Sequence, residues 1–81
     1  MPTKEQVTEF ILEHLAEALK IDKSQLTMDT DIIADFHATS LNIFPFVNVM
    51  EDEYDIEIQY SDFRVNCKKL GMLIDYLYDL I

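Results

Sequence analysis

Apolar side chains recur every three or four positions in three separate stretches of this chain, which is the period of a helix with one buried face. The first stretch follows Thr3 and Gln6, which have the spacing of a capping box, and predicts a helix over about Lys4–Lys20. The second predicts a helix ending near Asp55, and the third a helix at the carboxyl end. The three stripes are Val7, Phe10, Ile11, Leu15, Ala18 and Leu19; Ile43, Phe46, Val47, Met50 and Tyr54; and Leu70, Leu73, Ile74, Leu77 and Ile81.

The segments between these stripes predict shorter or irregular structure. Residues 21–39 lack the period and are rich in turn formers, which predicts a long ordered loop; a loop of this length is usually functional or hides an unrecognised element. Residues 61–64 suit one short helical turn. Pro45 predicts that the second helix begins late, near Asn42, or has a distorted first turn. Gly71 costs about 1 kcal/mol relative to Ala in a helix, unless close packing requires it.

We therefore expect an all-α fold. One glycine and two prolines in 81 residues argue against a sheet with many tight turns, and 49% apolar residues support a folded core. The expected architecture is a small four-helix bundle of three longer helices and one short helix, with a long loop between the first two. The chain is short enough to form a single domain over residues 1–81.

The charge balance restricts the partners. Sixteen acidic and six basic residues give a net charge of −10, which repels nucleic acid and anionic membranes and favours basic proteins or cations as partners. The chain has no export signal at its start and no apolar run of the roughly 18 residues that a membrane span needs. We expect a cytoplasmic protein.

Several kinds of reactive site are disfavoured by spacing. A calcium-binding loop beginning at Asp29 would need Gly at the position of Ala34 and Glu at the position of Ser40. His14 and His37 have no second histidine or cysteine nearby for a metal site. A hydrolase nucleophile would need a glycine-flanked serine, and Cys67 is expected to be a buried or incidental thiol. We expect no catalytic residue and no metal site.

Residues 35–41 read Asp-Phe-His-Ala-Thr-Ser-Leu, and residues 51–58 read Glu-Asp-Glu-Tyr-Asp-Ile-Glu-Ile. This resembles the acyl carrier protein family, whose pattern is Asp-Leu-Gly-Ala-Asp-Ser-Leu, then an apolar helix, then a run of acids, an aromatic residue and a final Glu-Ile. The register needs no gap. Residues 73–77 also resemble the last helix of the family, so the resemblance covers essentially the whole chain.

The resemblance implies a carrier rather than an enzyme. Ser40 would receive a phosphopantetheine arm from coenzyme A through a separate phosphopantetheinyl transferase that uses a divalent cation. The thiol of the arm would then hold acyl groups as thioesters in fatty acid, polyketide or related specialised biosynthesis. Partners would be the transferase and acyl-loading and acyl-processing enzymes with basic docking patches, and the carrier would be a free-standing monomer. The alternative is an unmodified helical interaction or regulatory protein in which Ser40 or Thr39 only caps a helix.

Four positions depart from the family pattern. Thr39 stands where the family usually has Asp, which puts recognition by a general-purpose transferase in question, and His37 replaces Gly, which makes a backbone with positive φ costly. Asn42 and Pro45 occupy positions where the family commonly has an acid, so the front of the second helix is less charged.

The resemblance also places partner docking on the exposed face of the second helix. Helical spacing assigns this face Thr39, Leu41, Phe44, Asn48, Glu51 and Asp52. Phe44 is either an exposed contact residue, which would indicate an apolar docking surface and dedicated partners, or part of the core beside Ile43 and Val47.

We expect added salt or magnesium to raise the melting temperature, because both screen the repulsion among the acidic residues. A gain of about 1 kcal/mol in stability would correspond to a rise of about 4–8 °C for a domain of this size. Calorimetry at several ionic strengths measures this, and a flat response would show that repulsion does not limit stability.

Overall fold

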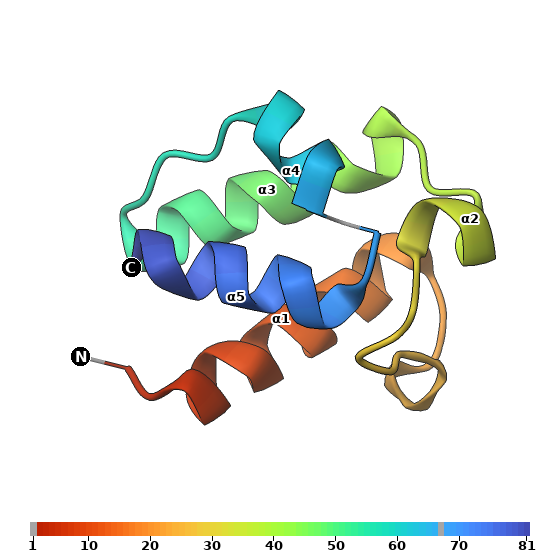
Figure 1. Cartoon of the computed structure of the whole chain (residues 1–81), viewed down its shortest axis with the longest axis horizontal. Coiled ribbons are helices and arrows are strands. Elements are labelled where there is room, and N and C mark those ends of the chain that lie inside the picture. The colour runs from red at the N-terminus through yellow and green to blue at the C-terminus, as the bar shows by residue number, and fades with distance from the viewer. Residues whose placement is uncertain (1, 67) are drawn as a thin grey trace.

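The computed structural model describes residues 2–66 and 68–81, and its secondary structure over these ranges is helical, without strands (Figure 1). The elements are α1 (Lys4–Leu19), the 3₁₀-helix η1 (Lys23–Gln25), α2 (Ile32–Phe36), α3 (Ser40–Tyr54), α4 (Tyr60–Asn66) and α5 (Leu70–Leu80). The predicted all-α fold is confirmed. Four helices of seven residues or more form the bundle, and α2 is an additional short one. Cys67 lies outside the described residues.

The ends of α1 follow from local hydrogen bonds. Thr3 Oγ1 accepts from the Gln6 N–H at 3.1 Å, and Gln6 Oε1 accepts from the Thr3 N–H at 2.9 Å, so the predicted capping box is present. The helix ends at Leu19, because Lys20 adopts the left-handed conformation with a φ of 58°. Its backbone N–H then satisfies carbonyls of the last turn, as at many helix ends.

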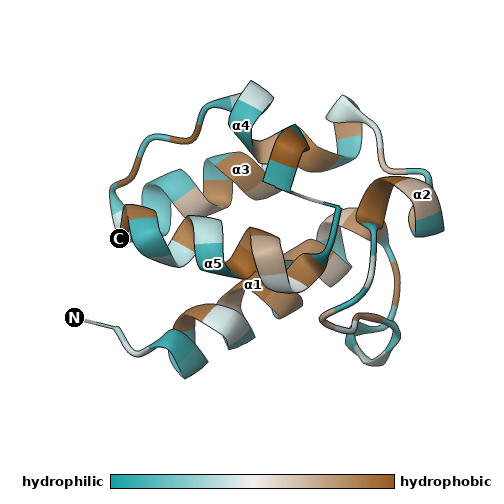
Figure 2. Cartoon of the chain, viewed as in Figure 1, coloured by the Kyte–Doolittle hydropathy of each residue, from teal (hydrophilic) through white to brown (hydrophobic). Residues whose placement is uncertain are grey.

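One core joins the long helices. α1 packs against both α3 and α5, and the hydrophobic colour in Figure 2 is concentrated where these three helices approach one another. From α4, the buried Phe63 reaches Phe46 of α3, with ring centroids 6.2 Å apart. The predicted stripes supply most of the fully buried side chains: Val7, Ile11, Leu15, Ile43, Phe46, Met50, Leu70, Leu73 and Leu77. No helix within the described residues is long and apolar enough to cross a membrane.

The predicted long loop over residues 21–39 contains two short helices, which are the kind of unrecognised element that a loop of this length can hide. Asp22 Oδ1 accepts from the Ser24 N–H at 2.9 Å at the start of η1, which lowers the pKa of the Asp22 carboxyl below its ordinary value. Asp31 Oδ1 accepts from the N–H groups of Ile33 and Ala34, each at 3.0 Å, at the start of α2. The turn formers noted in the sequence therefore act as helix caps.

This segment is fastened to the start of α5. Thr30 is buried, its Oγ1 accepts from the Thr27 N–H at 2.8 Å, and its carbonyl accepts from the Leu70 N–H at 2.8 Å. The Met28 carbonyl accepts from the Gly71 N–H at 2.9 Å. Two amides that a helix leaves unpaired at its start are thus satisfied by the loop.

The start of α3 differs from the expectation that Pro45 delays it to Asn42. The helix begins at Ser40, and the Thr39 carbonyl accepts from the N–H groups of both Asn42 and Ile43 at 3.0 Å. Pro45 lies in the second turn and has no N–H to offer the Leu41 carbonyl. Because Leu41 is 85% exposed, water can hydrate that carbonyl, which makes the proline tolerable.

We expect Gly71→Ala to raise the free energy of unfolding by about 0.5–1 kcal/mol, because Ala favours a helix and reduces the freedom of the unfolded chain. A Cβ at this position would lie 3.4 Å from the Met28 carbonyl oxygen and 3.6 Å from Met28 Cβ, both ordinary contacts, so packing does not require glycine. Urea unfolding measures the change, with the bulkier Gly71→Val as a control that should destabilise. Lower stability of the Ala variant would show that the contact with Met28 requires glycine.

Candidate functional site

The chain enters α3 through a sharp turn at the end of α2. His37 adopts the left-handed conformation, with φ 54° and ψ 38°, and its N–H donates to the Ile32 carbonyl. The Ala38 N–H donates to the same carbonyl at 3.3 Å. The positive φ considered for this position is present, and a side chain with a Cβ pays roughly 1–2 kcal/mol for it. The turn places Thr39 and Ser40 at the amino end of α3.

Thr39, and not Ser40, is the N-cap residue of α3. Its hydroxyl donates to Asn42 Oδ1 at 3.0 Å, and its backbone N–H donates to the same oxygen at 3.1 Å. Ser40 is the first residue of the helix and is partly exposed. Within residues 2–66 and 68–81, the Ser40 hydroxyl has no hydrogen-bond partner. Its oxygen is therefore not needed to cap the helix and is open to solution chemistry.

The surroundings of Ser40 suit a phosphate group. The backbone N–H groups of Ser40 and Leu41 have no partner among the described residues, as expected for the first turn of a helix. They stand at the positive end of a helix of 15 residues whose first turn carries no acid. A phosphodiester on Ser40 Oγ would meet these amides and this dipole, so the residues present fit a phosphopantetheine arm.

The six residues predicted to contact partners are mostly exposed. Leu41 is 85% exposed, Phe44 is 48% exposed, and Thr39, Asn48 and Asp52 are exposed as well. Glu51 is partly buried, and its Oε2 accepts from the Ile58 N–H at 2.9 Å. This acid therefore holds the segment after α3 in place, a role that its position in the sequence did not reveal.

The question left open for Phe44 is answered by a contact with α4. Its ring meets the Tyr60 ring edge-on, with centroids 4.9 Å apart and an angle of 69° between the planes. About half of the side chain remains in contact with solvent. Phe44 is thus a supported surface residue rather than part of the core. The contribution of Tyr60 was not predictable from the sequence, since nothing in its neighbours signals a pairing 16 positions away.

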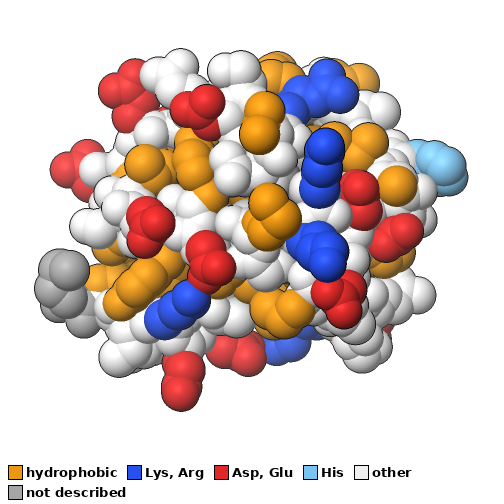
Figure 3. All heavy atoms as spheres, in the orientation of Figure 1, with side chains coloured by type: hydrophobic (Ala, Val, Ile, Leu, Met, Phe, Trp, Pro, Cys, Tyr) orange, Lys and Arg blue, Asp and Glu red, His pale blue; other side chains and the backbone are white. Residues whose placement is uncertain are grey.

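The charges on the surface are unevenly distributed. In Figure 3, acidic side chains are scattered over the face shown, whereas several of the basic side chains line up at the right and others lie apart. Three of the six basic residues, Arg64, Lys68 and Lys69, fall within six positions at the end of α4 and the connection to α5. Within the described residues, no group of three or more His, Cys, Asp or Glu side chains could hold a metal ion.

Comparison with known proteins identifies the family. The model for a phosphopantetheine attachment site matches residues 9–77. An acyl carrier protein of Exiguobacterium sibiricum is 33% identical over 75 residues, which cover 93% of this chain and 94% of that protein. Acyl carrier proteins of Rickettsia canadensis and Rickettsia rickettsii are each 32% identical over 77 residues, which cover 95% of this chain and 88% of theirs. The chain belongs to the acyl carrier protein family.

Acyl carrier proteins are carriers and not enzymes, and their phosphopantetheine group supplies the thiol that holds the acyl chain. They work with a phosphopantetheinyl transferase and with acyl-processing enzymes. The motif at residues 35–41 coincides with a helix start in the structure. Ser40 is the first residue of α3, and Thr39 before it is the N-cap residue.

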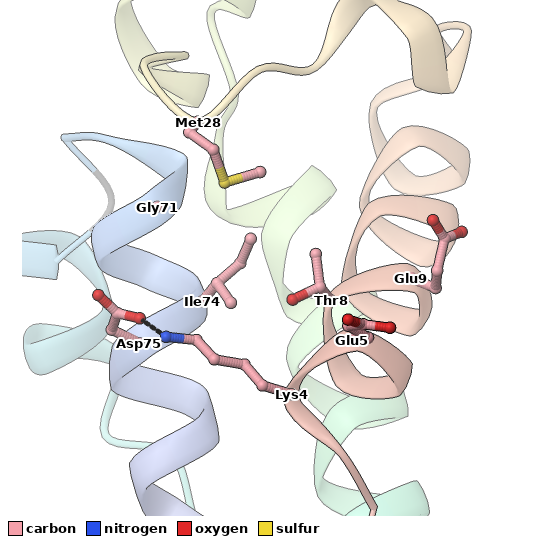
Figure 4. Close-up of a pocket in the computed structure, with 8 residues that line it drawn as sticks. All are labelled: Lys4, Glu5, Thr8, Glu9, Met28, Gly71, Ile74 and Asp75. Atoms are coloured by element: carbon pink, nitrogen blue, oxygen red, sulfur yellow. Dashed lines mark hydrogen bonds and ion pairs between the residues drawn. The ribbon is translucent and has the colours of Figure 1, made fainter.

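A groove runs between α1 and α5, and none of its lining residues within the described part of the chain belongs to α3. It has a volume of about 830 Å³, and Figure 4 shows side chains of both helices bordering it, with Met28 at one end. Lys4 and Asp75 form an ion pair there, and the Asp75 carboxylate raises the pKa of the Lys4 ammonium through a hydrogen bond and its charge. The described residues that line the groove are Lys4, Glu5, Thr8, Glu9, Met28, Gly71, Ile74 and Asp75, and they include neither Ser40 nor any predicted docking residue.

We expect His37→Gly to raise the free energy of unfolding by about 1 kcal/mol, because glycine adopts the left-handed conformation without a steric cost. Ala38→Gly is the matched control: Ala38 does not have a positive φ, so glycine there only adds freedom to the unfolded chain and should destabilise. Thermal and urea unfolding of the two variants measure this. Equal losses of stability in both would mean that the His37 side chain contributes contacts worth more than the strain.

Proposed function

We propose that Ser40 Oγ is the attachment atom for phosphopantetheine and that this chain carries acyl intermediates as thioesters on that arm. The cargo belongs to fatty acid, polyketide or related specialised biosynthesis. The observation that supports the proposal lies at the start of α3. Thr39 is the N-cap residue and its hydroxyl bonds to the Asn42 side chain, whereas the Ser40 hydroxyl has no partner in the part of the chain that the structure describes. A free hydroxyl beside open helix amides is what attachment of a phosphate group at this serine requires.

The arm and its cargo stay accessible in this arrangement. Ser40 is partly exposed and follows a turn held by α2, so a group attached to its oxygen projects from the end of α3. The amides of Ser40 and Leu41 favour the negative phosphate and so restrain the attached end of the arm. The distal thiol remains at the disposal of partner enzymes.

The partners in this proposal are a phosphopantetheinyl transferase and acyl-loading and acyl-processing enzymes. They dock on the exposed face of α3, at Thr39, Leu41, Phe44, Asn48, Glu51 and Asp52. The strongly negative net charge favours partners whose docking patches include basic groups. We further propose that residues 1–81 form one carrier domain that acts as a monomer in the cytoplasm.

The test is modification by a transferase. Incubation with coenzyme A, magnesium and a promiscuous phosphopantetheinyl transferase should add one phosphopantetheinyl group per chain, seen by intact-protein mass spectrometry. Ser40→Ala should abolish the gain. Ser61→Ala is a matched control, because Ser61 is an exposed serine in the first turn of α4, and it should leave the gain unchanged.

Two outcomes would contradict the proposal. Modification that persists in Ser40→Ala would move the attachment to another residue. A folded wild-type chain that gains no mass with several transferases would favour the unmodified interaction protein instead.

A further inference from the structure

We infer that enzymes acting on this carrier recognise it mainly through an apolar patch at the start of α3, made of Leu41 and Phe44, and only secondarily through ion pairs. The inference rests on the proposed attachment at Ser40, because it names the kind of partner surface that must approach that residue. Four observations support it.

Two polar side chains at the front of α3, those of Thr39 and Asn42, already bond to each other. The Asn42 carboxamide oxygen accepts from both the hydroxyl and the N–H of Thr39. The large hydrophobic side chains exposed at the front of α3 are Leu41 and Phe44, which are 85% and 48% exposed. A partner that approaches Ser40 must therefore cover apolar surface.

Charge is absent from the same part of the helix. Residues 40–50 include no Asp, Glu, Lys or Arg, and the acids of α3 begin at Glu51. Ser40 and Glu51 are eleven positions apart on the helix, roughly 16 Å at 1.5 Å per residue. This exceeds the screening length of about 8 Å at physiological ionic strength, so the acids of α3 act weakly at Ser40.

One of those acids, Glu51, already holds an internal hydrogen bond. The Glu51 carboxylate accepts from the Ile58 N–H at 2.9 Å, so an ion pair with a partner would compete with an internal hydrogen bond. Asp52 and Glu53 remain exposed on the last turn. They can orient a basic group at the far end of the helix while the apolar patch makes the contact beside Ser40.

One of the two side chains of the apolar patch, Phe44, is supported by a neighbouring helix before any partner arrives. The Phe44 ring rests edge-on against Tyr60 of α4, so little of its rotational freedom remains to be lost on binding. Rigid aromatic side chains with partial exposure are typical anchors of protein interfaces. The matching partner surface is an apolar depression next to the entrance through which Ser40 reaches coenzyme A.

The experiment measures the KM of a promiscuous phosphopantetheinyl transferase for wild type and four variants. We expect Leu41→Ala and Phe44→Ala each to raise KM about tenfold. Asp52→Asn should raise it about twofold. Met72→Ala is the matched control. Met72 lies on α5, outside the patch, and its exposed fraction of 45% is similar to that of Phe44. The ratio of KM between Leu41→Ala and wild type should not change with added sodium chloride, since an apolar contact is not screened.

The outcomes separate this inference from the proposed function. A wild type that is modified, together with a larger effect of Asp52→Asn than of Leu41→Ala, overturns the inference and leaves Ser40 as the attachment site. Equal effects of the two, or a Leu41→Ala ratio that falls with salt, overturn it as well. A folded wild-type protein that gains no phosphopantetheine arm would contradict both the inference and the proposed attachment at Ser40. Leu41 is 85% exposed, so its variant should keep the fold even if Phe44→Ala loses stability, and circular dichroism checks this.

Discussion

The Asn42 carboxamide oxygen accepts two hydrogen bonds from Thr39, one from the hydroxyl and one from the backbone N–H, and the candidate site depends on this arrangement. It fixes the start of α3 at Ser40 and assigns the capping role to the residue before it. Ser40 then has a free hydroxyl and a free amide at the positive end of the helix.

The connection that precedes α3 is itself held in place by hydrogen bonds and by a turn in the backbone. Buried Thr30 ties the long connection to the first amide of α5, Asp31 caps α2, and His37 turns the chain with a positive φ. The strain at His37 is a cost that the surrounding hydrogen bonds offset. A domain of this size has a stability of roughly 4–12 kcal/mol, so each of these contacts is a considerable part of the total.

Charge and apolar surface play different parts in the molecule. The excess of acidic residues makes the long-range electrostatic field negative and favours positively charged partner surfaces. The uncharged front of α3 provides the side chains that contact a partner near Ser40. Glu51 shows why an acidic residue cannot be assigned to docking from its position alone, since its carboxylate also fastens the chain at Ile58.

Helices α1, α3 and α5 were predictable, because each is long enough for its apolar residues to repeat over several turns, as Val7, Ile11 and Leu15 do in α1. The family and the candidate serine were also readable, since residues 35–41 and 51–58 are contiguous motifs. Helix α2 was not, because its five residues span little more than one turn and leave no period. The support of Phe44 by Tyr60 and the bond between Glu51 and Ile58 depend on how α3 ends and α4 folds back, and such contacts between separated residues have no local signature.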